Sequence, residues 1–149
     1  MSAEKTRELI HVLMAEDSPT DAELAQFALE DAKVEIDLKI VEDGVDAMKY
    51  LHKEEPYQNA QIPDLILLDL NMPRMSGQEV LNKVRTDPNL NRIPIVILTT
   101  SDAQEDIDAA YDNHANAYVT KPVDFEQLVE IVHQIENFWF QIVKLPTKP

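Results

Sequence analysis

The stretch Leu65-Ile66-Leu67-Leu68-Asp69-Leu70-Asn71-Met72-Pro73 decides the fold of this chain. Its short apolar run lies between Pro63-Asp64 and Met72-Pro73, which predicts a strand buried on both faces of a parallel sheet. Asp69 stands where that strand ends, and packing does not explain a carboxylate at this point. Open parallel sheets place their sites just outside the carboxyl ends of their strands, so Asp69 is the first candidate site residue.

Three other apolar segments end in polar residues in the same way. With the residues that follow them, they are His11–Ala15 before Glu16-Asp17, Pro94–Leu98 before Thr99, and Ala117–Thr120 before Lys121. If the four strands are parallel neighbours, these polar side chains and Asp69 meet at one edge of the sheet.

This set of side chains suits phosphoryl transfer to a carboxylate. Glu16, Asp17 and Asp69 offer the hard oxygen ligands that Mg²⁺ prefers, and crowded carboxylates need a cation or shared protons. An aspartate can attack phosphorus and form an aspartyl phosphate. Mg²⁺, the Lys121 ammonium and the Thr99 hydroxyl can each stabilise an oxygen of the incoming group.

With these motifs in order, the chain resembles the receiver domain of two-component response regulators over residues 9–138. The matching positions are Glu16-Asp17, Asp69 through Pro73 with Gly77 following, Thr99, Tyr118 and Lys121-Pro122. The resemblance implies a flavodoxin-like α/β fold, with a doubly wound sheet of five parallel strands in the order 2-1-3-4-5 and helices on both faces.

The resemblance also implies a role for each position. Asp69 is the phosphoacceptor, Thr99 and Tyr118 are the switch residues, and Lys121 contacts the phosphoryl group. The expected Mg²⁺ ligands are Glu16 (through water), Asp17, Asp69 and the backbone carbonyl of Asn71. The family carries a cis bond at the position of Lys121-Pro122, so the same is expected here.

Each residue taken alone has an ordinary structural interpretation. Asp69 can close a turn, and Glu16-Asp17 can favour the dipole of the following helix. Thr99 can be a β-branched strand residue, Tyr118 a core aromatic with its hydroxyl at the edge, and Lys121 a surface lysine. The functional interpretation rests on their joint occurrence at strand ends.

Composition sets limits on the partners. The 149 residues suffice for one core, and the formal net charge of −15 argues against nucleic acid or an anionic membrane as the main partner. There is no cysteine, and no apolar run approaches the ~20 residues of a membrane span. These features fit a cytoplasmic protein. We expect an N-terminal tail (1–8), the receiver (9–138) and an aromatic C-terminal extension (139–149).

Alternating strand and helix patterns support the α/β assignment. Besides the four segments above, we expect a strand at 36–41, helices at 18–31, 44–52, 77–86, 103–113 and from 124 onward, and a long polar loop at 53–63.

The C-terminal aromatics Phe138, Trp139 and Phe140 form a candidate interface. Trp139 and Ile142 can continue the apolar stripe of the last helix, but Phe138 and Phe140 cannot both share it, so at least one is exposed. The tail either folds over its own core or forms a contact patch, and we favour the patch. With this tail and the long loop before Ile62-Pro63, the chain resembles the stand-alone response regulators of bacterial phytochromes. The resemblance implies a homodimer through the fourth helix, fifth strand and fifth helix.

The predicted function is that of a response regulator. It accepts a phosphoryl group from a sensor histidine kinase (a phytochrome, if the closer resemblance holds) and signals by protein–protein contact, without turnover as an enzyme. A phosphatase of the haloacid dehalogenase type is the alternative, but it needs a second aspartate where this chain has Asn71. A third candidate, a pseudo-receiver that only binds partners, would have a broken acid site.

Overall fold

The computed structural model describes residues 9–148, in which strands and helices alternate along the chain. The predicted N-terminal tail, residues 1–8, lies outside the described residues. The elements are β1 (Ile10–Ala15), α1 (Pro19–Glu30), β2 (Ile36–Val41), α2 (Gly44–Leu51), β3 (Leu65–Leu68), α3 (Gly77–Arg85), β4 (Ile95–Thr99), α4 (Gln104–Asp112), β5 (Ala117–Thr120), α5 (Phe125–Asn137) and the π-helical turn η2 (Phe138–Ile142).

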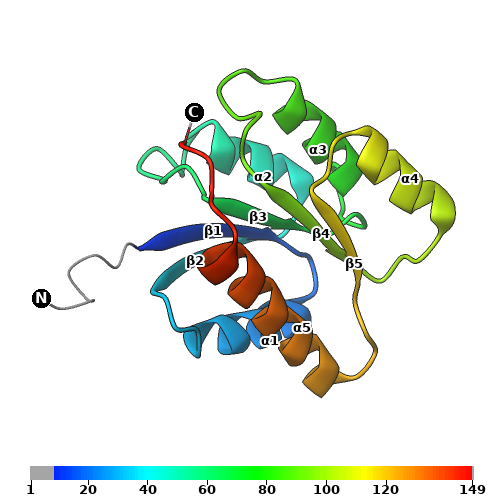
Figure 1. Ribbon diagram of the computed structural model, residues 1–149. Coiled ribbons are helices and arrows are strands. Elements are labelled where there is room, and N and C mark those ends of the chain that lie inside the picture. The colour runs from blue at the N-terminus through cyan, green and yellow to red at the C-terminus, as the bar shows by residue number, and fades with distance from the viewer. Residues whose placement is uncertain (1–8, 149) are drawn as a thin grey trace, which may run out of the picture.

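The strands form one parallel sheet in the order β2-β1-β3-β4-β5, which confirms the predicted fold. Helices α1 and α5 cover one face, while α2, α3 and α4 cover the other (Figure 1). The central strand β3 has β1 and β4 as neighbours, so the site-bearing ends of β1, β3 and β4 stand side by side.

Alternation within the strands produces two separate cores. Leu13 of β1 and Ile66 of β3 belong to the cluster beneath α2 and α3, whereas Met14 and Leu67 belong to the cluster beneath α1 and α5. Successive strand residues point to opposite faces, and both faces are covered, so an uninterrupted apolar run is required. This explains why β3 reads as four apolar residues with no polar alternation.

The helix starts follow the capping residues of the sequence. Ser18 caps α1, with Pro19 in the first turn, and Ser76 with Glu79 forms a complete capping box on α3. The predicted helix bounds agree with the structure to within one or two residues, since end residues such as Asp31 and Thr86 are caps rather than helical.

Both glycines allow close backbone approach. A Cβ on Gly44 would lie 2.2 Å from the carbonyl oxygen of Met75, and one on Gly77 would lie 2.3 Å from that of Asp69. Gly77 therefore lets α3 begin directly against the end of β3, which fixes the backbone next to the candidate phosphoacceptor.

The aromatic C-terminus divides between core and surface. Trp139 and Phe140 pack against the core cluster of α1 and α5, while the side chains of Phe138 and Ile142 are 50% and 62% exposed. The exposure of Phe138 confirms that the two phenylalanines do not share the stripe. The prediction for Ile142 was wrong, because Val143 donates to the carbonyl of Phe138 in a widened π turn that changes the helical register.

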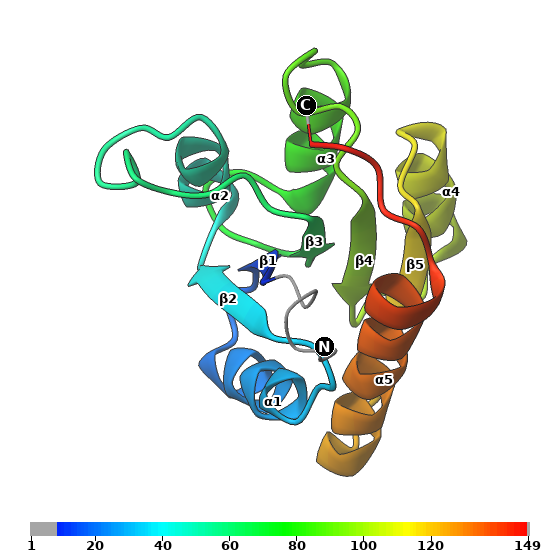
Figure 2. The same ribbon diagram turned by 60° about the vertical axis from the view of Figure 1, so that its left-hand side comes forward.

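Beyond η2 the chain turns back along the edge where the strands begin (Figure 2). Lys148 there forms an ion pair with Asp64, just before β3, at 3.5 Å. Over residues 9–148, no helix combines the length and apolar character needed to cross a membrane.

Candidate functional site

Three acidic side chains converge at the carboxyl ends of β1 and β3. Glu16, Asp17 and Asp69 each place a carboxylate oxygen within 4.8 Å of the others. Glu16 and Asp69 are buried, whereas Asp17 is exposed at the mouth of the site. Hard oxygen donors at this spacing suit a divalent cation such as Mg²⁺.

Backbone bonds continue past the strand ends and fix this edge. The Glu16 N–H donates to Val41, the Asp69 N–H donates to Ala15, and the Lys121 N–H donates to Thr99, at 2.9, 3.0 and 2.6 Å. Each site residue is therefore held by the neighbouring strand, so its position follows from the sheet register.

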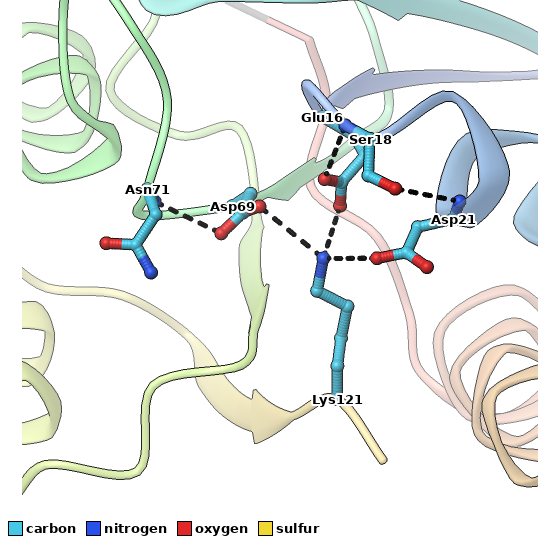
Figure 3. A network of polar contacts seen from close by, with 6 residues as sticks. All are labelled: Glu16, Ser18, Asp21, Asp69, Asn71 and Lys121. Carbon is cyan, nitrogen blue, oxygen red and sulfur yellow. Dashed lines mark hydrogen bonds and ion pairs between the residues drawn. The ribbon is translucent and has the colours of Figure 1, made fainter. Parts of the chain in front are cut away.

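Lys121 lies at the centre of the acids (Figure 3). Its ammonium donates to Glu16 Oε1 and to Asp21 Oδ2 at 2.8 Å each, and to Asp69 Oδ2 at 3.4 Å. The Lys121 side chain is buried, so water does not screen these contacts strongly. One cation thus faces three anions, and the exposed Asp17 adds a fourth negative charge nearby.

Burial and the excess of acids over cations shift the pKa values of Glu16 and Lys121. Burial, together with the neighbouring charge of Asp69, raises the pKa of Glu16 from 4.5 to about 7, against the opposing effect of Lys121. Burial lowers the pKa of Lys121, but its bonds to Asp21 and Glu16 and the charge of Asp69 outweigh that and raise it overall. The lysine therefore stays charged, whereas the acids carry more negative charge than the site readily holds.

Asn71 lies beside the phosphoacceptor candidate through its backbone. Its N–H donates to Asp69 Oδ1 at 3.1 Å, which orients the carboxylate. The Gly77 N–H donates to the Leu70 carbonyl at 3.0 Å and closes the loop around this position.

Thr99 and Tyr118 stand on β4 and β5. Thr99 is fully buried, and its Oγ1 has no hydrogen-bond partner within the described part of the chain. A buried hydroxyl without a partner is costly, and it is a donor available to an added oxygen. The Tyr118 hydroxyl donates to the Ser101 carbonyl at 2.9 Å, which ties β5 to the loop before α4.

Asp21 is a site residue that the sequence analysis missed. It lies in the first turn of α1. Because α1 begins directly after the carboxyl end of β1, an acid in its first turn could have been placed at the same edge of the sheet.

One expectation for the lysine was wrong. Within residues 9–148 the one cis peptide bond is Glu55-Pro56, so the Lys121-Pro122 bond is trans. The trans form is the favoured isomer of an X–Pro bond by about 0.5–1 kcal/mol, and the Lys121 contacts form without the other isomer.

The assembled groups fit a divalent cation and a phosphoryl group. The acids supply oxygen ligands, Lys121 supplies a buried positive charge, and Thr99 supplies a free donor. Carboxylate nucleophile, cation and donor are the parts that phosphoryl transfer requires.

Comparisons with known proteins confirm the predicted resemblance to receiver domains. The family model for the response regulator receiver domain matches residues 12–133. The chain is 42% identical over 135 residues to the response regulator Rcp1 of Synechocystis sp., covering 91% of this chain and 92% of Rcp1.

Two solved structures are similar throughout. The phosphorylated cyanobacterial phytochrome response regulator RcpA has a TM-score of 0.91 at 44% identity, covering 94% of this chain and 100% of RcpA. The Mn²⁺-bound form of Rcp1 has a TM-score of 0.89 at 41% identity, covering 93% and 99%.

Proposed function

Because this chain belongs to the response regulator receiver family and is related to phytochrome response regulators, we propose that Asp69 accepts a phosphoryl group from the phosphohistidine of a sensor histidine kinase. Output then passes to another protein by contact. The observation that carries this proposal is the buried Asp69 carboxylate, with the Lys121 ammonium 3.4 Å from its Oδ2 and two further acids within reach.

The transfer is a displacement at phosphorus. An oxygen of the Asp69 carboxylate forms the new O–P bond as the N–P bond of the phosphohistidine breaks. The electron pair of that bond stays on the imidazole nitrogen, which is then free to take a proton. The Lys121 ammonium and the Thr99 hydroxyl stabilise the transferred oxygens by charge and by a hydrogen bond.

We assign the metal site to the same edge. Glu16 (through water), Asp17, Asp69 and the Asn71 carbonyl would hold Mg²⁺, which when bound neutralises charge on the phosphoryl oxygens. Support comes from the acidic cluster and from the Mn²⁺-bound form of the related Rcp1.

Phosphorylation would bias a pre-existing equilibrium of the switch residues. The new oxygens offer Thr99 Oγ1 the partner that it lacks, which would draw that side chain toward Asp69. Tyr118 would then leave the Ser101 carbonyl and rotate into the space that Thr99 vacates. The changed surface would be that of α4, β5 and α5, where a partner can read it.

The aromatic segment supports a proposal about assembly. Phe138 is half exposed beside Trp139, at a centroid distance of 5.7 Å, and Phe140 is partly buried. We infer a homodimer through α4, β5, α5 and these aromatics, a phytochrome as kinase and a cytoplasmic location. Sedimentation of the wild-type protein and of Phe138→Ser tests the dimer, which the substitution should weaken.

Reaction with a small phosphodonor tests whether Asp69 accepts a phosphoryl group. The protein is incubated with acetyl phosphate and Mg²⁺, and its intact mass is measured beside Asp69→Asn and a sample without metal. We expect one added phosphoryl group that requires both the metal and Asp69. Steady release of phosphate without an adduct would instead support the phosphatase, and neither adduct nor release would support a pseudo-receiver.

A further inference from the structure

The contacts of Lys121 with its carboxylate partners are unequal in length. The ammonium has three donors and three carboxylate partners, but the short bonds of 2.8 Å go to Glu16 and Asp21. The contact to Asp69 is longer, at 3.4 Å. A lysine facing only Glu16 and Asp69 would be free to move closer to Asp69, because charge-assisted N–H···O bonds favour about 2.7–2.9 Å.

The start of α1 directs the Asp21 side chain to this contact. Asp21 occupies the third helical position after the cap Ser18, where an acidic side chain often bonds back to the N–H of the cap. In α3 this happens, since Glu79 Oε1 accepts from the Ser76 N–H at 3.3 Å. In α1 the Ser18 N–H donates to Glu16 Oε2 instead, at 3.1 Å, which leaves Asp21 available for Lys121.

Glu16 and Asp21 therefore act together on the same lysine. Glu16 uses one oxygen for the helix cap and the other for the ammonium, so its position is fixed by both. Asp21 is fixed by its place on α1, where its own N–H donates to Ser18 Oγ at 3.2 Å. Figure 3 shows Asp21 and Asp69 approaching the ammonium from different sides.

We propose that Asp21 is a positioning residue that, with Glu16, holds the Lys121 ammonium directed at Asp69 but away from a short ion pair with it. This rests on the proposed function of Asp69. A tight ion pair would occupy a lone pair of the nucleophile and leave the ammonium too close to receive a phosphoryl oxygen. Held at the longer distance, Lys121 leaves Asp69 free to attack and is positioned for the group that arrives.

The test compares single substitutions at Asp21 with one nearby. Asp21→Ala removes both the acceptor and the charge, Asp21→Asn keeps an oxygen acceptor, and Glu23→Ala removes one exposed negative charge from the same helix. We expect Asp21→Ala to slow phosphorylation by acetyl phosphate by about 10- to 100-fold, the scale of a misplaced group. Asp21→Asn should retain most of the rate, and Glu23→Ala should retain all of it.

A second readout follows the lysine without any phosphodonor. The ¹H–¹⁵N signal of the Lys121 ammonium, assigned by its absence in Lys121→Arg, should shift in Asp21→Ala and remain near its wild-type position in Asp21→Asn and Glu23→Ala. Circular dichroism confirms that each variant is folded.

The outcomes separate the two proposals. An unmoved Lys121 signal in Asp21→Ala overturns the positioning role, whatever the phosphorylation result. Wild-type rates for Asp21→Ala also overturn it, and so do faster rates for both Asp21 variants, which would mean that Asp21 acts as a competing charge. Wild-type protein that accepts no phosphoryl group refutes the function of Asp69 instead.

Discussion

Two cationic side chains at opposite ends of the sheet, the half-buried Arg85 and the buried Lys121, have hydrogen-bond partners of different charge. At the end where the strands begin, the Arg85 guanidinium donates to the carbonyls of His114, Asn91 and Ile93 and to the Asn116 side-chain oxygen, at 2.7 to 3.1 Å. At the end where they finish, the Lys121 ammonium donates to three carboxylates. One cation has neutral partners, and the other has charged ones.

The difference separates a structural network from the network at the proposed phosphorylation site. Burial lowers the pKa of Arg85, whose partners are neutral, whereas the acids around Lys121 raise the pKa of the lysine. The Arg85 partners are backbone and amide groups whose number is fixed by the fold. The Lys121 partners are anions in excess of the cation, so their contacts can change when charge is added at Asp69.

Replacement of Lys121 should have the largest effect. Lys121→Met removes the positive charge next to the transferred group, and we expect the phosphorylation rate to fall by about 10²- to 10³-fold, as for loss of one preorganised donor. Rates measured by intact mass with acetyl phosphate check this, with Lys83→Met, an exposed lysine on α3, as the control. Equal phosphorylation rates for wild type and Lys121→Met would show that the Lys121 charge does not assist the transfer.

Mg²⁺ should stabilise the protein in a pH-dependent manner. The folded state holds the Glu16 proton more tightly than the unfolded state, so this group makes the metal-free protein less stable as the pH rises from 4.5 to about 7. Mg²⁺ requires deprotonated ligands, so it should stabilise the protein more at pH 8 than at pH 5. At 100 times its Kd at pH 8 it should add about 2.7 kcal/mol, and the same concentration should add less at pH 5.

Urea unfolding with and without Mg²⁺ at the two pH values measures this effect. Glu16→Gln should remove the fall in stability between pH 4.5 and 7. An Mg²⁺ effect of the same size at both pH values would contradict the assignment of the acids.

Much of this site was predictable, because a parallel sheet brings strand ends together. Asp69 and Glu16 end neighbouring strands, so their meeting follows from strand order, whereas Lys121 follows β5 beyond β4 and reaches both acids with its long side chain. Asp21 was missed because its role depends on which carboxylate accepts from the Ser18 N–H, and side-chain geometry decides that. The Ile142 prediction failed because a π turn changed the helical register, and spacing arguments assume a regular helix.

Replacement of Arg85 should affect stability but not chemistry. Arg85→Met leaves several carbonyl oxygens without donors, and we expect the free energy of unfolding to fall by about 1–3 kcal/mol. The folded protein should be phosphorylated at the wild-type rate. Urea unfolding measures the loss of stability, and intact mass measured on the same sample gives the phosphorylation rate. Slower phosphorylation of fully folded Arg85→Met would show that the Arg85 network also affects the chemistry.

The smallest effect should come from the Thr99 hydroxyl. Thr99→Val removes a buried hydroxyl that has no partner within residues 9–148, so we expect the unphosphorylated protein to gain up to about 1 kcal/mol of stability. Thr86→Val is the control, because its hydroxyl donates to the Asn82 carbonyl at 2.9 Å and should give no gain. A loss of stability in Thr99→Val would show that the hydroxyl already has a partner.

The most direct test of the central claim locates the phosphoryl group on the chain. After reaction with acetyl phosphate and Mg²⁺, borohydride reduction converts an aspartyl phosphate to homoserine, and peptide mass spectrometry identifies its position. We predict homoserine at position 69, dependent on Mg²⁺. Homoserine at Asp17 or at any other position, with Asp69 unmodified, would contradict the account.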